Sequence, residues 1–107
     1  MVSKVYFTRE ITPEGLMRIY KALGVELKGK VGVKISSGEP GGNNYLHPEL
    51  IGELVNSLHG TIIECCTAYG GRRTEPGEHW KAIAEHGFTA AFPCDRHCAR
   101  FSIGLTQ

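Results

Sequence analysis

The sequence has no long apolar run, no excess of charge of one sign and no low-complexity segment, and each absence excludes a class of protein. No stretch approaches the roughly 18 apolar residues that a membrane-spanning helix needs, and the N-terminus lacks the apolar stretch of a signal peptide. Twelve basic and eleven acidic residues leave a net charge of +1, which gives no overall field to attract nucleic acid or an anionic membrane. We therefore expect a cytoplasmic protein that binds neither a membrane nor nucleic acid.

The cysteines do not have the pattern of a secreted framework. The chain has four cysteines, of which Cys65 and Cys66 are neighbours, and this arrangement without an export signal argues against a secreted disulfide framework. Reduced thiols are the expected state. The length of 107 residues and the apolar fraction of 41% match a globular domain with a single core.

Segments with the composition of strands alternate with segments that have the apolar spacing of helices. The expected strands cover residues 4–7, 31–35, 61–65 and 88–92. The expected helices begin near residues 13, 48 and 78. This alternation predicts an α/β fold, a βαβαβαβ series with a mainly parallel sheet flanked by helices.

Several short motifs follow one another in an order that general α/β patterns do not explain. They are Lys30-Val31-Gly32-Val33-Lys34-Ile35, Gly38-Glu39-Pro40-Gly41, Asn44-Tyr45-Leu46, Pro48-Glu49 and Glu85-His86-Gly87-Phe88. In these motifs the chain, over residues 2–90, resembles the opening portion of the bacterial and archaeal family known as domain of unknown function 362. The resemblance implies an incomplete part of a larger fold and, as in some members, association with ferredoxin-type iron–sulfur modules. It supplies no catalytic residue, because the family has no assigned reaction.

Residues 92–107 depart from that family pattern and show no clear period. We expect an α/β domain over residues 1–91 and, after it, an atypical tail that marks a truncation or a frameshift. Cys94, His97 and Cys98 in this tail are plausible zinc or iron ligands. They are weak candidates, because the Cys-x-x-x-Cys spacing has no second pair elsewhere at the spacing of a structural zinc site.

Two glycine-bearing loops follow the second and third expected strands, over residues 36–44 and 67–74. In open parallel sheets, ligands bind beyond the carboxyl ends of the strands, and backbone amides of such loops can hold an anion. We therefore expect a small anionic ligand at this edge. The candidate ligand-binding residues are Ser37, Gly38, Glu39, Gly41, Asn43, Asn44, Tyr45, Arg72 and Arg73.

Each of these assignments has a simpler alternative. The first loop matches no established phosphate-binding motif, Glu39 would repel an anion, and the glycines could serve flexible turns alone. Arg72 and Arg73 could clamp a carboxylate or phosphate, but an adjacent pair is commonly solvated, with diverging side chains. Glu64 would be a candidate acid or base if it were buried, although a strand-end carboxylate in water is the more common case. For the remaining polar side chains we expect a buried thiol at Cys65 and exposed or capping imidazoles at His59, His79 and His86.

Two functions from different classes fit these patterns, and the sequence does not decide whether the chain is an enzyme. The first is the ligand-binding part of an iron–sulfur-associated redox protein. The second is a non-catalytic fragment or interaction module, whose sheet edge and helix faces are covered by a missing remainder or by a second copy. Under the second function we expect a homo-oligomer.

Overall fold

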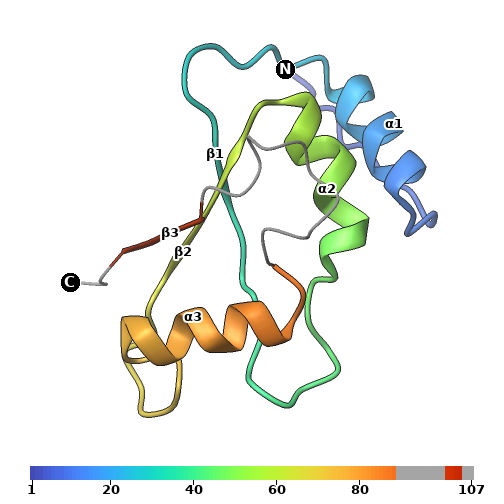
Figure 1. The fold of residues 1–107 in the computed structure, drawn as a ribbon. Helices are drawn as coiled ribbons and strands as arrows, with labels where there is room; N and C mark the ends of the chain where they lie inside the picture. The colour runs from blue at the N-terminus through green and yellow to red at the C-terminus, as the bar shows by residue number, and fades with distance from the viewer. Residues whose placement is uncertain (89–100, 105–107) are drawn as a thin grey trace.

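The computed structural model describes residues 1–88 and the backbone of residues 101–104, and these segments form an α/β protein (Figure 1). The elements in chain order are α1 (Pro13–Leu23), β1 (Gly32–Lys34), α2 (Pro48–Ser57), β2 (Thr61–Cys65), α3 (Pro76–Glu85) and β3 (Phe101–Gly104). Helices and strands therefore alternate from α1 onward. The expected boundary after residue 91 lies outside the described residues.

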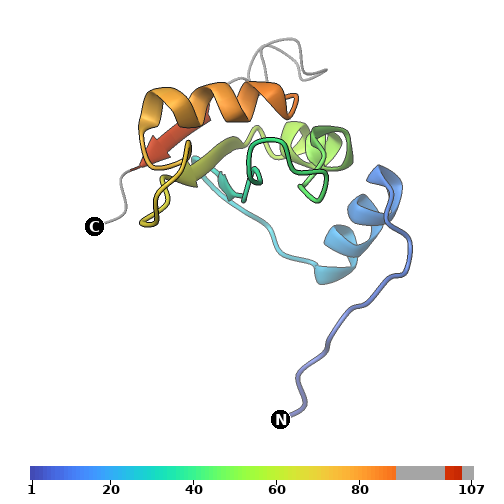
Figure 2. The ribbon, with the colours of Figure 1, turned by 90° about the horizontal axis from the view of Figure 1, so that it is seen from below.

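The three strands form a parallel sheet in the order β1-β2-β3. Gly32 of β1 is paired with Thr61 of β2, and Ile62 of β2 is paired with Phe101 of β3. Each parallel neighbour requires a crossover connection, here through α2 and then α3, and right-handed crossovers in this order place both helices on one face. In Figure 2, α3 lies along one face of β2 and β3.

The core lies between the sheet and these two helices. Val55 of α2 and Ile83 of α3 have no exposed surface, and Ile62 of β2 faces them from the sheet. The alternation of a strand gives β2 two unlike faces, because Ile62 and Glu64 are buried whereas Ile63 between them is exposed. The buried core residues are Ile35, Ile51, Val55, Ile62, Ile83 and Phe88.

The first helix begins and ends where its local sequence predicts. The Thr12 hydroxyl accepts a hydrogen bond from the amide of Gly15 at 3.0 Å, Pro13 occupies the first turn, and Gly24 ends the helix with a φ of 68°. This helix packs against α2 and not directly on the sheet (Figure 1). Of the helices in the described segments, none is long and apolar enough to cross a membrane.

The expected strand at residues 4–7 is wrong. These residues form an extended arm that runs away from the sheet (Figure 2), with Val5 89% and Phe7 82% exposed. Strand propensity reflects packing on a paired surface, and here α1 separates the arm from the sheet. The βαβαβαβ series is therefore shortened to βαβαβ in the described segments, preceded by α1.

The strand expected over residues 88–92 is not seen in its described part. Phe88 belongs to no strand, and residues 89–92 lie outside the described residues. The strand that follows α3 is β3, within the segment expected to be an atypical tail. Its backbone pairs with β2 through residues 62–65, so this part of the tail belongs to the sheet.

Candidate functional site

A buried ion pair lies at the carboxyl end of the sheet. Glu64 is the fourth residue of β2 and is only 2% exposed, and its Oε1 atom lies 2.7 Å from Nη2 of Arg73, which is 7% exposed. The amide of Ser37 donates a second hydrogen bond to the same oxygen at 3.0 Å. The expectation of a water-exposed Glu64 is therefore wrong, because the strand alternation places this side chain on the face that α3 covers.

The second terminal nitrogen of Arg73 contacts the loop that follows β1. Its Nη1 atom lies 2.9 Å from Oε1 of Glu39, and the Tyr69 hydroxyl donates to that same oxygen at 2.7 Å. The hydrogen bond from Tyr69 and the bond and charge of Arg73 lower the pKa of Glu39, so this carboxyl is ionised at neutral pH. Arg73 thus joins the loop after β1 to the loop after β2.

The loop after β2 is folded to present Arg73. The amide of Thr67 donates to the Arg73 carbonyl at 3.0 Å, and the Thr74 hydroxyl donates to the Tyr69 carbonyl at 2.6 Å. These two hydrogen bonds join the start of the loop to its end, at Arg73 and at the residue that follows it. The positions of Arg73 and Tyr69 are therefore set by the same short segment.

Two imidazoles complete the cluster. His79 of α3 is fully buried, and its Nε2 atom lies 3.4 Å from Oε2 of Glu64. Burial lowers the pKa of His79 in spite of the nearby Glu64, which favours the neutral ring. Nδ1 of His86 donates to the Ser37 carbonyl at 2.6 Å, and its ring stacks on Tyr45 with centroids 3.9 Å apart.

The expectation of exposed or capping histidines is wrong for His79 and correct for His59, which is exposed. His86 is the C-cap residue of α3, as expected, but its ring is buried. The reason is helical spacing. His79 precedes the buried Ile83 by four residues, so the two side chains lie on the same face of α3 and are turned toward the sheet. This spacing was the available signal for a buried His79.

Several buried polar atoms of this cluster have no hydrogen-bond partner among the described residues. They are Ser37 Oγ, Glu64 Oε2, Arg73 Nε, both ring nitrogens of His79 and His86 Nε2. Glu64 Oε2 and His79 Nε2 approach each other but are not aligned as a hydrogen bond. Buried polar groups normally form hydrogen bonds to protein or to ordered water. The cluster therefore has donors and acceptors to which water or a polar ligand can hydrogen-bond.

Glycine is required at one position of the loop that carries Glu39. Gly38 has a φ of 89°, and a Cβ atom there would lie 2.4 Å from Cβ of Tyr45. Gly41, with a φ of 76°, lies within a turn in which the Gly42 amide donates to the Glu39 carbonyl at 3.0 Å. Asn43 and Asn44 are exposed beyond this turn.

The structure separates the two adjacent arginines. Arg72 lies along α3, where Nη2 and Nη1 are 2.7 Å and 3.0 Å from the carboxylate oxygens of Glu85, and Nε is 3.5 Å from Glu78. The expected divergence of the pair is confirmed, whereas the expectation that both are solvated is wrong for Arg73. Arg72, a candidate ligand-binding residue, does not join the cluster around Glu64.

The two cysteines at the end of β2 differ in burial. Cys66 is buried, and burial raises the pKa of its thiol, whereas Cys65, expected to be buried, is half-buried because it lies on the other face of β2. Within residues 1–88 no group of three or more His, Cys, Asp or Glu side chains could hold a metal ion. Cys94, His97 and Cys98 lie outside the described residues, so the metal and iron–sulfur expectations stay predictions.

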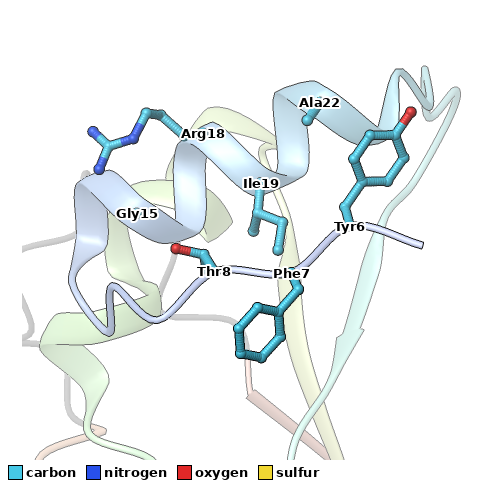
Figure 3. A pocket seen from close by; sticks show the side chains of 7 residues that line it. All are labelled: Tyr6, Phe7, Thr8, Gly15, Arg18, Ile19 and Ala22. Atoms are coloured by element: carbon cyan, nitrogen blue, oxygen red, sulfur yellow. The ribbon is translucent and has the colours of Figure 1, made fainter. Parts of the chain in front are cut away.

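A second, apolar surface lies between the N-terminal arm and α1. One hollow of about 400 Å³ is lined by Val5 and Tyr6 of the arm and by Leu16, Ile19 and Leu23 of the helix, among others. A smaller hollow of about 200 Å³ adjoins it, and Figure 3 shows Ile19 pointing toward the arm between Tyr6 and Phe7. The larger hollow is mainly apolar, whereas Thr8 and Arg18 also line the smaller one.

No family model, curated protein or solved structure matches this chain. The resemblance to domain of unknown function 362 therefore stays a prediction from the sequence motifs. Three of those motifs lie at the charged cluster, since they carry Glu39, Tyr45 and His86, and the Tyr45 ring stacks on that of His86.

Proposed function

We propose that this chain is the ligand-binding part of a protein, with the ligand held where the loops of residues 36–44 and 67–74 meet. The observation that supports the proposal is the bridge from Glu64 through Arg73 to Glu39. A buried ion pair contributes little net stability compared with apolar packing. The role that we assign to the pair is to fix a guanidinium at the carboxyl ends of the strands, where ligands bind in parallel α/β folds.

The groups around this edge suit a small polar ligand. Arg73 and Tyr69 supply donors, the loop glycines bring backbone close, and the buried imidazole of His79 adds a group that can accept or donate. A small anion, the class expected from the sequence, would use the two donors. The two donors come from the loop of residues 67–74 and the glycines from the loop of residues 36–44, so binding would depend on the two loops lying side by side.

The test is an amide NMR titration of the complete chain with acetate and inorganic phosphate, with glycerol as an uncharged control. We expect shift changes concentrated in residues 36–44 and 67–74 with an anion and none with glycerol. Arg73→Lys should abolish them, because one ammonium cannot reproduce the forked contacts of a guanidinium. Arg72→Lys is the matched control and should leave them unchanged. Loop shifts that survive Arg73→Lys, or no loop shifts with either anion, would contradict the proposal.

The iron–sulfur context is proposed from the sequence resemblance alone. Its residues would be Cys94 and Cys98, with His97 between them. Iron, zinc and acid-labile sulfide should be measured in protein purified without oxygen and without a metal-binding tag. Stoichiometric iron and sulfide, lost in Cys94→Ser and Cys98→Ser, would support a redox role, and metal-free protein would remove it.

Self-association is a second candidate function, favoured by the apolar surface of the arm and α1. Val5 lines the larger hollow and Phe7 the smaller one, and both side chains are exposed. The arm and α1 thus present one exposed apolar patch, and a two-fold symmetric contact buries such a patch against the same patch of a second copy. The occupant that we propose is a second copy of this chain.

A further inference from the structure

One carboxylate oxygen of Glu39 lies in a site with two donors. Oε1 accepts from Arg73 Nη1 at 2.9 Å and from the Tyr69 hydroxyl at 2.7 Å. The hydrogen bond to Glu39 raises the pKa of Tyr69, so the hydroxyl keeps its proton and remains a donor. These two groups have the arrangement of a receptor for a carboxylate oxygen.

Arg73 does not depend on Glu39 for its position. Its Nη2 atom is held by buried Glu64 at 2.7 Å and lies 3.5 Å from the Ser36 hydroxyl, so the inner side of the guanidinium is already fixed. Only Nη1 is used by Glu39. If Glu39 moved away, the guanidinium would stay in place, with one donor directed at the vacated position.

Glu39 is the most easily displaced member of this group. Its side chain is 53% exposed, whereas those of Arg73 and Glu64 are 8% and 1% exposed. It lies between Gly38 and Gly41, whose positive φ values show a backbone that bends sharply on both sides of it. The Glu39 carboxylate is already half in water, so its movement off Arg73 desolvates no charge and leaves the Arg73–Glu64 pair intact.

We infer that Glu39 occupies the binding position of a ligand carboxylate, and that such a ligand binds by displacing Glu39 from Arg73 and Tyr69. This inference rests on the proposed function and names its ligand class. A carboxylate is favoured over a phosphate dianion because it replaces one negative charge with another beside Glu64. A dianion would add repulsion that nearby Glu64 makes unfavourable.

The experiment measures the dissociation constant of acetate by amide NMR for the complete wild-type chain and for Glu39→Gln. Removing the competing charge should tighten acetate binding by about tenfold, because charge-assisted hydrogen bonds are markedly stronger than neutral ones. Glu26→Gln is the control, since it changes the net charge equally at an exposed position and should leave the constant unchanged. Glu39→Ala should behave as Glu39→Gln does.

The outcomes separate this inference from the proposed function. Equal acetate binding at the two loops in the wild type and Glu39→Gln would overturn the displacement of Glu39 but leave the ligand site standing. Loop shifts with phosphate and none with acetate would overturn the carboxylate class alone. Loop shifts with neither anion in any variant would overturn both. A tenfold gain in Glu39→Gln, absent in Glu26→Gln, would establish the inference.

Discussion

The carboxylate of Glu64 and the guanidinium of Arg73, nine residues apart in the chain, form a buried ion pair of 2.7 Å beneath the two loops that follow β1 and β2. The pair lies at the carboxyl ends of the strands, where α/β proteins bind ligands. Because Ser37 also donates to Glu64, one carboxylate fixes both loops. The stability of the chain and the shape of the edge should therefore depend on the same side chains.

Removal of the Arg73 side chain should be far more costly than removal of its neighbour. Arg73→Ala leaves the Glu64 charge buried without its partner, and we expect a loss of about 3–5 kcal/mol in the free energy of unfolding. Arg72→Ala breaks an exposed ion pair with Glu85, which solvent screens, and should cost far less. Urea unfolding followed by circular dichroism measures both, and equal losses would mean that the buried pair has no special role.

Gly38→Ala should destabilise the loop that carries Glu39. The substitution combines a positive φ with a Cβ atom 2.4 Å from that of Tyr45, and a cost of at least about 1–3 kcal/mol is expected. Gly77→Ala in α3 is the matched control, because no atom lies within 4 Å of the added Cβ and alanine is a better helix former. Unchanged unfolding of Gly38→Ala would show that the loop has another conformation.

Protonation of His79 should weaken the fold as the pH falls. Burial lowers the pKa of His79 in the folded chain, whereas in the unfolded chain it titrates near its ordinary value of about 6.5. Between these two values the unfolded chain binds more protons, so the free energy of unfolding declines with falling pH and is fully retained above the unfolded value. The lowered pKa of Glu39 acts in the same direction at more acidic pH.

The measurement is the urea midpoint of the wild type and of His79→Gln between about pH 8 and pH 5. We expect the wild-type midpoint to fall more steeply than that of the variant. NMR titration of the His79 ring should give a value below the ordinary one. A normal or raised value would contradict the buried, neutral imidazole.

Val5→Ser and Phe7→Ser should weaken self-association. Both side chains are exposed and line the two hollows beside α1, and their burial against a second copy would favour a dimer. Light scattering coupled to size exclusion, over a range of concentrations, should give a higher mass for the wild type than for the double variant. A wild type that is monomeric at every concentration would exclude this second function.

The helices were predictable because their starts are local chemistry. Thr12 and Pro13 begin α1, and Pro48 begins α2. The third helix begins at Pro76, two residues before its expected start near residue 78. Strand identity was less predictable, because a strand needs a partner. Residues 4–7 have strand composition but find no edge, whereas β3 pairs with β2 although its segment showed no clear period.

The sequence predicted which two loops form the candidate site, but not all of the side chains that lie in it. The order of strands and loops pointed to residues 36–44 and 67–74, and the structure joins these loops through Arg73. The burial of Glu64 and His79 depends on which face of the sheet α3 covers, and that is a property of the whole chain. Tyr69 gave no signal of its own, because its role comes from contact with Glu39, thirty residues away.

The most direct test of the binding edge is a crystal structure of Glu39→Gln grown in acetate. We expect an acetate oxygen within hydrogen-bond distance of both Arg73 Nη1 and the Tyr69 hydroxyl, with Glu64 still paired to Nη2 and the side chain at position 39 turned away. A structure in which the substituted side chain stays on Arg73 and Tyr69, with no acetate bound there, would contradict a carboxylate site at this edge.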